Sequence, residues 1–219
     1  GFSKGDRICV DPVIPCGSCQ YCLSGLENVC ANRKAIGYEF DGAFAEYVRI
    51  PAEAVAAGNV RKIPDGVSWE SAALAEPLAC CINGQEKVGV DLGDTVVVIG
   101  AGPIGLMHVR LAKASGAARV IVSELHQHRR ETSLSFGADL VSNPETDDLK
   151  TLVDDATNGL GADVVILAIG VPQLAETALS LARKGGRVSL FAGFAPQAKA
   201  QMDPNLIHYN EILVTGASA

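Results

Sequence analysis

The chain of 219 residues is long enough for one large domain or two modest ones, and its 48% hydrophobic and 20% charged residues are typical of a globular protein. Its net charge of -7, with no basic block, argues against a surface dedicated to nucleic acid. No apolar run approaches the roughly 18 residues of a membrane-spanning helix, so we expect no membrane partner.

Four cysteines lie close together in PCGSCQYCLSGLENVC (15–30). Cys16, Cys19 and Cys22 recur at every third residue, and Cys30 follows them. Adjacent C-x-x-C pairs form strained disulfides and favour metal capture or redox chemistry. Four thiolates suit a closed tetrahedral Zn²⁺ site that leaves no position for water or substrate. The spacing therefore predicts a structural zinc in an intracellular, cytoplasmic protein.

Two alternatives for this segment stay open. A disulfide framework would place the protein outside the cell, and a zinc knuckle would bind nucleic acid, although the nearly balanced local charge disfavours the knuckle. The other cysteines, Cys9, Cys80 and Cys81, lack this spacing and need no role beyond that of small buried hydrophobes.

The part of the chain before residue 90 predicts short strands followed by helices. AEYVRIP (45–51) has β-strand character, and PDG (64–66) is a turn. Ser68 is a predicted helix N-cap. Pro77 should interrupt that helix and start a second one, which ends near Lys87.

Apolar strands and helices alternate after residue 90. Six strands are predicted, at residues 95–100, 119–124, 139–141, 163–170, 187–193 and 211–216. Helices are predicted at 103–115, 127–136, 147–157 and 172–184. Gly116, Gly137 and the pair Gly185 and Gly186 should end three of these helices. The alternation and the near-continuous apolar strands predict a doubly wound parallel sheet of the Rossmann type.

The turn after the first of these strands carries a dinucleotide-binding pattern. In VVVIGAGPIGLM (96–107), Gly100, Gly102 and Gly105 have G-x-G-x-x-G spacing, and Pro103 takes the preferred first position of the next helix. Glycines let the backbone approach a pyrophosphate, which meets free N–H groups at the helix start. A purely structural turn is the alternative, but the strand before the motif and the apolar helix after it favour a dinucleotide.

Glu124 ends the second strand, about 20 residues beyond the glycine turn, where Rossmann folds carry an acid. A carboxylate there can accept hydrogen bonds from both ribose hydroxyls and repels a 2′-phosphate, so the sequence predicts NAD rather than NADP. A solvated glutamate is the alternative. Arg129, one helical turn further on, either supports the adenosine ribose or is a surface charge, and the sequence leaves both readings open.

Both halves of the chain together resemble one family. The resemblance covers essentially the whole chain and is carried by GDRICVDPVIPCGSCQYC (5–22), DGAFAEYV (41–48), ALAEPLACC (73–81) and GAGPIG (100–105). The chain is similar to the zinc-containing medium-chain alcohol dehydrogenases, and most to their sorbitol, threonine and related polyol or sugar-acid branch. The lack of Tyr-x-x-x-Lys disfavours the short-chain dehydrogenases, and the cysteine lobe disfavours the zinc-free quinone reductases.

The resemblance implies a fold and a set of site residues. It implies that residues 1–78 form a partial, mainly β, GroES-like catalytic domain, which contains the zinc lobe around the four cysteines of residues 15–30. Residues 79–219 are implied to form an NAD-binding Rossmann domain. It also implies that Glu76 faces a second, catalytic Zn²⁺, directly or through water; favourable placement at a helix start is the alternative for this acid. Residues implied to contact the dinucleotide are Ile104 at the glycine turn and, on the nicotinamide side, Ala192, Gly193 and Phe194.

The implied activity is oxidation of a polyol, sugar acid or amino alcohol with transfer of hydride to NAD. The family draws its other catalytic ligands, a Cys and a His-Glu pair, from a segment upstream of the first residue here, so we expect these residues alone to be inactive or impaired. None of the four histidines stands in a ligand-like setting. A simple alcohol dehydrogenase and a non-catalytic module that binds NAD and zinc are the alternatives. The family also implies a homodimer or homotetramer.

Overall fold

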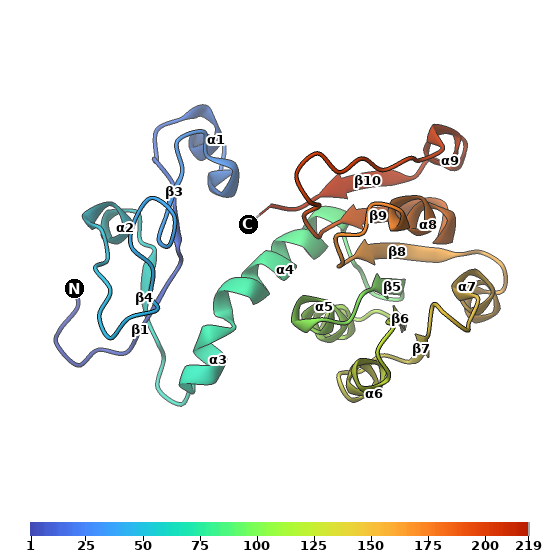
Figure 1. Cartoon of the computed structure of the whole chain (residues 1–219), viewed down its shortest axis with the longest axis horizontal. Coiled ribbons are helices and arrows are strands. Elements are labelled where there is room, and N and C mark those ends of the chain that lie inside the picture. The colour runs from blue at the N-terminus through green and yellow to red at the C-terminus, as the bar shows by residue number, and fades with distance from the viewer. Residues whose placement is uncertain (219) are drawn as a thin grey trace. The chain divides into compact units, whose positions relative to one another are not determined.

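A computed structural model describes residues 1–218, which form two compact units, Gly1–Glu76 with Ser218 and Pro77–Ala217 (Figure 1). The first unit contains two antiparallel strand pairs: β1 (Ile8–Val10) with β4 (Val60–Lys62), and β2 (Val13–Ile14) with β3 (Lys34–Ala35). Its helical segments are α1 (Gln20–Leu23), the 3₁₀ turn η1 (Glu27–Val29), α2 (Ala52–Ala56) and α3 (Trp69–Ala73). None of the helices within residues 1–218 has the length and apolar character needed to cross a bilayer.

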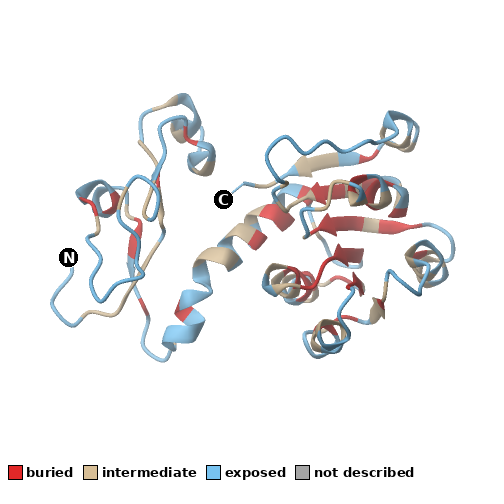
Figure 2. Ribbon diagram, in the orientation of Figure 1, coloured by how far each residue is buried: buried red, intermediate tan, exposed pale blue. Residues whose placement is uncertain are grey.

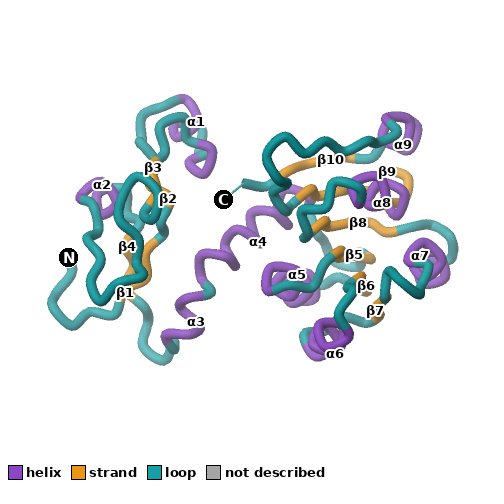
Figure 3. Tube along the Cα trace, viewed as in Figure 1, coloured by secondary structure: helices purple, strands orange, loops and turns teal. Residues whose placement is uncertain are grey.

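The strand predicted at 45–51 is wrong. This segment lies in the long loop between β3 and α2 (Figure 3), and none of the described strands pairs with it. Tyr47 is 91% exposed there. Alternation of apolar and polar residues stabilises a strand only when a neighbouring strand satisfies its backbone groups, and such a neighbour is missing from the described residues.

Ser68 caps α3 as predicted, because its Oγ accepts a hydrogen bond of 3.1 Å from the N–H of Ser71. The break between the two helices falls at Leu74, slightly earlier than predicted, and α4 spans Ala75–Val88. Pro77 therefore lies inside the first turn of α4. Its missing N–H costs nothing there, since the first N–H groups of a helix have no partner within the helix.

The second unit is built on a six-stranded parallel sheet, which confirms the Rossmann-type prediction. The strands are β5 (Thr95–Ile99), β6 (Arg119–Ser123), β7 (Leu140–Ser142), β8 (Ala162–Leu167), β9 (Ala182–Leu190) and β10 (Leu213–Gly216). Their order is β10-β9-β8-β5-β6-β7, so the chain leaves β5 in one direction and returns at β8 on its other side. A ligand crevice forms at the carboxyl ends of the strands where the order reverses in this way.

Two apolar layers cover the sheet, and its strands form most of the buried part of the unit (Figure 2). The helices of the unit, after α4, are α5 (Pro103–Ala114), α6 (Gln127–Ser135), α7 (Leu149–Thr157), α8 (Leu174–Leu181) and α9 (Pro204–Asn210). Val88 of α4 and Val109 of α5 pack on one face, whereas Val153 of α7 and Leu179 of α8 pack on the other. This two-sided burial explains the near-continuous apolar strands.

The helix predicted at 172–184 ends earlier, at Leu181, so Gly185 and Gly186 do not end it. They lie in β9, where the register against β8 shifts between Ala162 and Val164. A Cβ at Gly186 would stand 2.7 Å from the carbonyl oxygen of Arg183, so the two glycines permit a β-bulge. Gly116 and Gly137 end α5 and α6 with positive φ, as predicted.

Helix α9 was not predicted from the sequence, although it begins with a clear local signal. The side chain of Asp203 accepts a hydrogen bond of 2.8 Å from the N–H of Asn205, and Pro204 occupies the first helical position. His208 is on this helix. The chain then passes through Glu211 with positive φ, so β10 begins at Leu213 rather than at residue 211.

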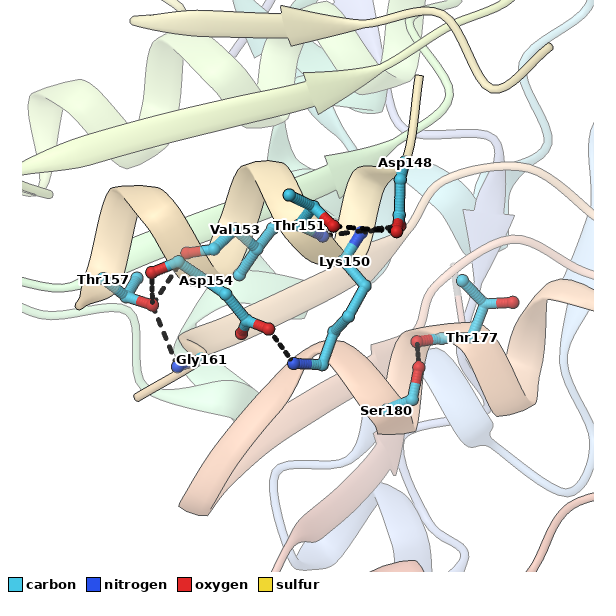
Figure 4. A network of polar contacts seen from close by, with 9 residues as sticks. All are labelled: Asp148, Lys150, Thr151, Val153, Asp154, Thr157, Gly161, Thr177 and Ser180. Carbon is cyan, nitrogen blue, oxygen red and sulfur yellow. Dashed lines mark hydrogen bonds and ion pairs between the residues drawn. The ribbon is translucent and has the colours of Figure 1, made fainter. Parts of the chain in front are cut away.

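Helix α7 is held by its own polar side chains (Figure 4). Asp148 caps it by accepting hydrogen bonds of 2.9 and 3.4 Å from the N–H groups of Lys150 and Thr151. Lys150 pairs with Asp154 one turn later, and the Thr157 Oγ1 accepts from the N–H of Gly161 at 2.9 Å. These contacts stabilise both ends of a short helix and direct the chain into β8.

His108 is fully buried in α5, and burial lowers its pKa from 6.5 to about 4. Because the unfolded chain binds this proton more readily, His108 should make the protein less stable as the pH falls from 6.5 towards 4, by roughly 3 kcal/mol when the loss is complete. Above pH 6.5, protonation of His108 should no longer change the stability of the protein.

Urea unfolding of wild type and His108→Leu at pH 7 and pH 5 measures this contribution. We expect the leucine variant to lose less stability between the two pH values than wild type does. His208→Leu, at an exposed position, serves as the control and should keep the wild-type dependence. Equal pH dependence of wild type and His108→Leu would contradict the prediction.

Candidate metal and dinucleotide sites

The four cysteines of residues 15–30 converge on one point. Their Sγ atoms all lie within 4.8 Å of one another, with 3.5 Å between Cys19 and Cys22 and 4.0 Å between Cys16 and Cys22. Sulfurs around a tetrahedral Zn²⁺ with Zn–S bonds of about 2.3 Å are about 3.8 Å apart, so the donor set fits this metal. Within residues 1–218, this is the one group of three or more His, Cys, Asp or Glu side chains that could hold a metal ion.

Local turns bring the thiols together. Cys19 is the N-cap of α1, Cys22 lies within it, and Cys30 follows η1. Gly17 and Gly25 adopt positive φ at the turns before and after α1. All seven cysteines are free thiols, in agreement with a metal site and against a disulfide framework among the described residues.

Backbone N–H groups point at the sulfurs. The N–H of Cys19 lies 3.3 Å from the Sγ of Cys16, and that of Asn32 lies 3.3 Å from the Sγ of Cys30. Hydrogen bonds from Ser18 and Cys19 lower the pKa of Cys16 to about 5, whereas burial raises the pKa of Cys22 to about 12. A cation at the centre favours the thiolate form of all four ligands.

The glycine turn connects β5 to α5 at the carboxyl end of the sheet. Gly100 has a φ of 96°, and its N–H donates to the carbonyl of Ser123 at 2.8 Å. A Cβ added at Gly105 would overlap the carbonyl oxygen of Gly100, so only glycine lets α5 approach β5 this closely. Gly100 and Gly105 therefore set the path of the turn, by conformation and by close packing.

Gly102 differs from these two glycines because its surroundings are open. It is the N-cap of α5, and a Cβ built on it would meet nothing within 4 Å. No side chain among the described residues caps this helix, and its first turn carries no acid. The N–H groups of Ile104 and Gly105 are thus directed to a space that an anionic group can enter, as the dinucleotide prediction requires.

Glu124 points at the same turn. Its Oε2 accepts from the N–H of Ala101 at 2.8 Å, its Oε1 accepts from the N–H of His126 at 2.9 Å, and Arg129 lies 3.8 Å away. Burial opposes ionisation of this side chain, but the two N–H groups and Arg129 outweigh it, so the pKa of Glu124 lies below its usual value. An ionised carboxylate has about four lone-pair sites and can still accept from further hydroxyls.

The segment after β9 lies at the same edge of the sheet. The N–H of Ala192 donates to the carbonyl of Leu167, at the end of β8, at 3.0 Å. A Cβ at Gly193 would meet nothing within 4 Å, whereas Phe194 packs on the apolar layer under α8 and α9. A side chain at Gly170 would overlap the carbonyl oxygen of Gly193. Gly170 was not predicted to have this role, because the strand expected at 163–170 included it, whereas β8 ends at Leu167.

The structure brings some of the predicted residues together and leaves others apart. The four cysteines form one cluster, and the glycine turn lies against Glu124 with Arg129 beside it. Glu76 is in the first turn of α4 and belongs to no cluster of ligand side chains within the described residues. The role of the Ala101 N–H, a backbone group, has no signature in the sequence.

Comparison with known proteins identifies the family. Residues 103–219 match the family described as Zinc-binding dehydrogenase, and residues 1–65 match the Alcohol dehydrogenase GroES-like domain. L-threonine 3-dehydrogenase from Pyrococcus furiosus is 39% identical over 216 residues, which are 99% of this chain and 60% of that protein. Sorbitol dehydrogenase from Halalkalibacterium halodurans is 37% identical over 99% of this chain and 62% of its own length.

Two similar solved structures carry nucleotides. A zinc-binding dehydrogenase from Sinorhizobium meliloti 1021 bound to NADP has a TM-score of 0.91 and 35% identity, and the match covers 99% of this chain and 63% of that one. A protein from Escherichia coli CFT073 described as a short chain alcohol dehydrogenase and complexed with NADH has a TM-score of 0.89 and 32% identity, and the match covers 98% of this chain and 61% of that one. This chain spans about 60% of the length of the curated relatives it matches. It belongs to the zinc-binding dehydrogenase family.

Proposed function

We propose that this protein is an NAD-dependent, zinc-containing dehydrogenase that oxidises a polyol, sugar acid or amino alcohol. The observation that carries the proposal is the turn at Gly102, open to an anion, with an ionised Glu124 directed at it. The relatives named threonine and sorbitol dehydrogenase support the substrate class. NAD, when bound, supplies a hydride acceptor, and a catalytic zinc, when bound, supplies a Lewis acid.

Each part of the chain has its own task in this reaction. Gly100 and Gly105 hold α5 close to β5, and the N–H groups at the start of α5 bind the pyrophosphate. Glu124 orients the adenosine ribose, and Arg129 supports the same sugar; the N–H groups of His126 and Ala101, and then Arg129, favour the ionised form of the acid. We assign Pro103 and Ile104 to contact with the dinucleotide at the glycine turn. We assign Ala192, Gly193 and Phe194 to the nicotinamide side of the site.

We assign Glu76 to the catalytic metal, as a ligand or through water. It precedes Pro77 at the start of α4, a helix end that favours a carboxylate by its dipole as well. Cys16, Cys19, Cys22 and Cys30 hold the structural zinc. We also assign residues 1–78 to the catalytic domain and 79–219 to the NAD-binding domain, with residue 219 outside the described residues; the boundary of the compact units at Pro77 supports this division.

We further propose that the protein is cytoplasmic and forms a homodimer or homotetramer. Zinc-binding thiolates must stay reduced, which favours a reducing compartment. Strand β10 pairs with β9 on one side and forms an edge of the described sheet on the other, and Leu213 on it is 53% exposed. A second copy can pair with such an edge.

The experiment that tests the nucleotide site measures binding of NAD⁺ and NADP⁺ by calorimetry. Gly102→Ala should fold as stably as wild type, because its φ of -66° suits alanine and its Cβ meets no neighbour, yet NAD⁺ affinity should fall at least about tenfold because the methyl group stands where the pyrophosphate approaches. Glu124→Ala should reduce the preference for NAD⁺. Wild type that binds NADP⁺ as tightly as NAD⁺ would contradict the ribose assignment.

A further inference from the structure

Three elements of the second unit meet at the ring of Phe191, directly after β9. On α4, a Cβ added at Gly84 would stand 2.6 Å from this ring, so glycine is needed for the contact. On α5, the ring of His108 meets it edge-on, with 4.4 Å between the centroids and an interplanar angle of 84°. Phe191 itself is tied to β8 by its N–H, which donates to the carbonyl of Leu167 at 3.2 Å.

A buried polar pair fixes the register of α4 against α5. The Nε2 of Gln85 donates to the carbonyl of His108 at 2.8 Å and lies 3.2 Å from the Nδ1 of the same residue. Since an amide NH₂ faces Nδ1, we assign the ring proton to Nε2. One turn earlier on both helices, the Sγ of Cys81 lies 3.9 Å from the carbonyl of Ile104. The two contacts repeat at the i, i+4 spacing of both helices.

Burying this polar pair lowers the stability of the core. Gln85 is 3% exposed and His108 is 0% exposed, and the Oε1 of Gln85 and the Nε2 of His108 have no hydrogen-bond partner within the described residues. A buried polar atom without a partner destabilises a protein, whereas two apolar side chains of similar size would not. Two leucines could pack in several registers, whereas hydrogen bonds are directional. The polar pair therefore holds α4 and α5 in one register.

The elements joined in this way carry the separate parts of the nucleotide site. Helix α5 begins at the glycine turn, and Phe191 leads into Ala192–Phe194. We propose that Gln85 and His108 are positioning residues, which align α4, α5 and the end of β9 so that the glycine turn and the segment after Phe191 are in place before a nucleotide binds. This inference rests on the proposed function for the identity of the ligand, and on the contacts above for the alignment.

The double variant Gln85→Leu with His108→Leu tests the proposal, because it removes both unpaired atoms and should be at least as stable as wild type. We expect faster amide hydrogen exchange at residues 100–106 and 191–194, and a Kd for NAD⁺ raised by roughly twofold to thirtyfold. If Gln85 and His108 had only a structural role, a double variant as stable as wild type would show wild-type amide exchange at both segments and an unchanged affinity for NAD⁺. Glu86→Gln, exposed on the same helix, is the control.

Gln85→Met, which keeps the length of the side chain but cannot donate, repeats the test if the double variant does not fold. Wild-type exchange at both segments in a folded variant would overturn the positioning role, and faster exchange supports it whether or not NAD⁺ binds. Wild type without affinity for NAD⁺ or NADP⁺ would instead contradict the proposed function. The two failures are therefore distinguishable.

Discussion

Replacing Cys19 with serine is expected to reduce the zinc content from about one ion per chain to nearly none. A serine hydroxyl is a poor ligand for Zn²⁺ at neutral pH, and Cys19 lies between two other ligands, with its sulfur 3.5 Å from that of Cys22 and 3.8 Å from that of Cys30. Structural zinc contributes roughly 10–16 kcal/mol of apparent binding free energy in small zinc peptides, so the lobe should lose its fold with the metal.

The measurement is the metal content after dialysis, together with limited proteolysis of residues 15–35. Cleavage should increase there, while the second unit, which has its own core, should stay intact. Cys9→Ser is the matched control, because Cys9 lies outside the cluster and its Sγ contacts the carbonyl of Ala72 at 3.6 Å. If Cys19→Ser retains a full complement of zinc, the four-thiolate site is wrong.

Gly105→Ala is expected to destabilise the second unit and to abolish NAD⁺ binding. The added methyl group would overlap the carbonyl oxygen of Gly100, which cannot move without disturbing β5. Overpacking of this kind costs about 1–3 kcal/mol or more, and α5 must shift away from the sheet. Urea denaturation gives the loss of stability, and calorimetry gives the loss of affinity.

Gly102→Ala provides the comparison, because the same methyl group there meets no protein atom. Its stability should stay within about 0.5 kcal/mol of wild type, as at other sites without strain. The two variants separate the two uses of glycine in the motif, close packing at Gly105 and approach of the ligand at Gly102. A Gly105→Ala protein as stable as wild type would show that α5 does not depend on this close contact.

The sequence predicted the second unit well because its pattern repeats. Central strands such as β5 and β8 are apolar and buried along most of their length, and glycines such as Gly116 and Gly137 mark the helix ends with a conformation that other residues avoid. Predictions failed where the outcome depends on a distant partner. The segment 45–51 has strand character without a pairing strand among the described residues, and Gly186 is needed for a bulge against β8 rather than for a helix end.

The candidate sites divide in the same way. By itself, the sequence determined the cluster of four cysteines and the path of the glycine turn, because both are formed by a few consecutive turns whose geometry is local. Only the tertiary structure decided that Glu124 accepts from Ala101 and that Gln85 and His108 meet within the core. Those contacts join segments far apart in the chain, and they form only when hydrophobic burial brings strands and helices together.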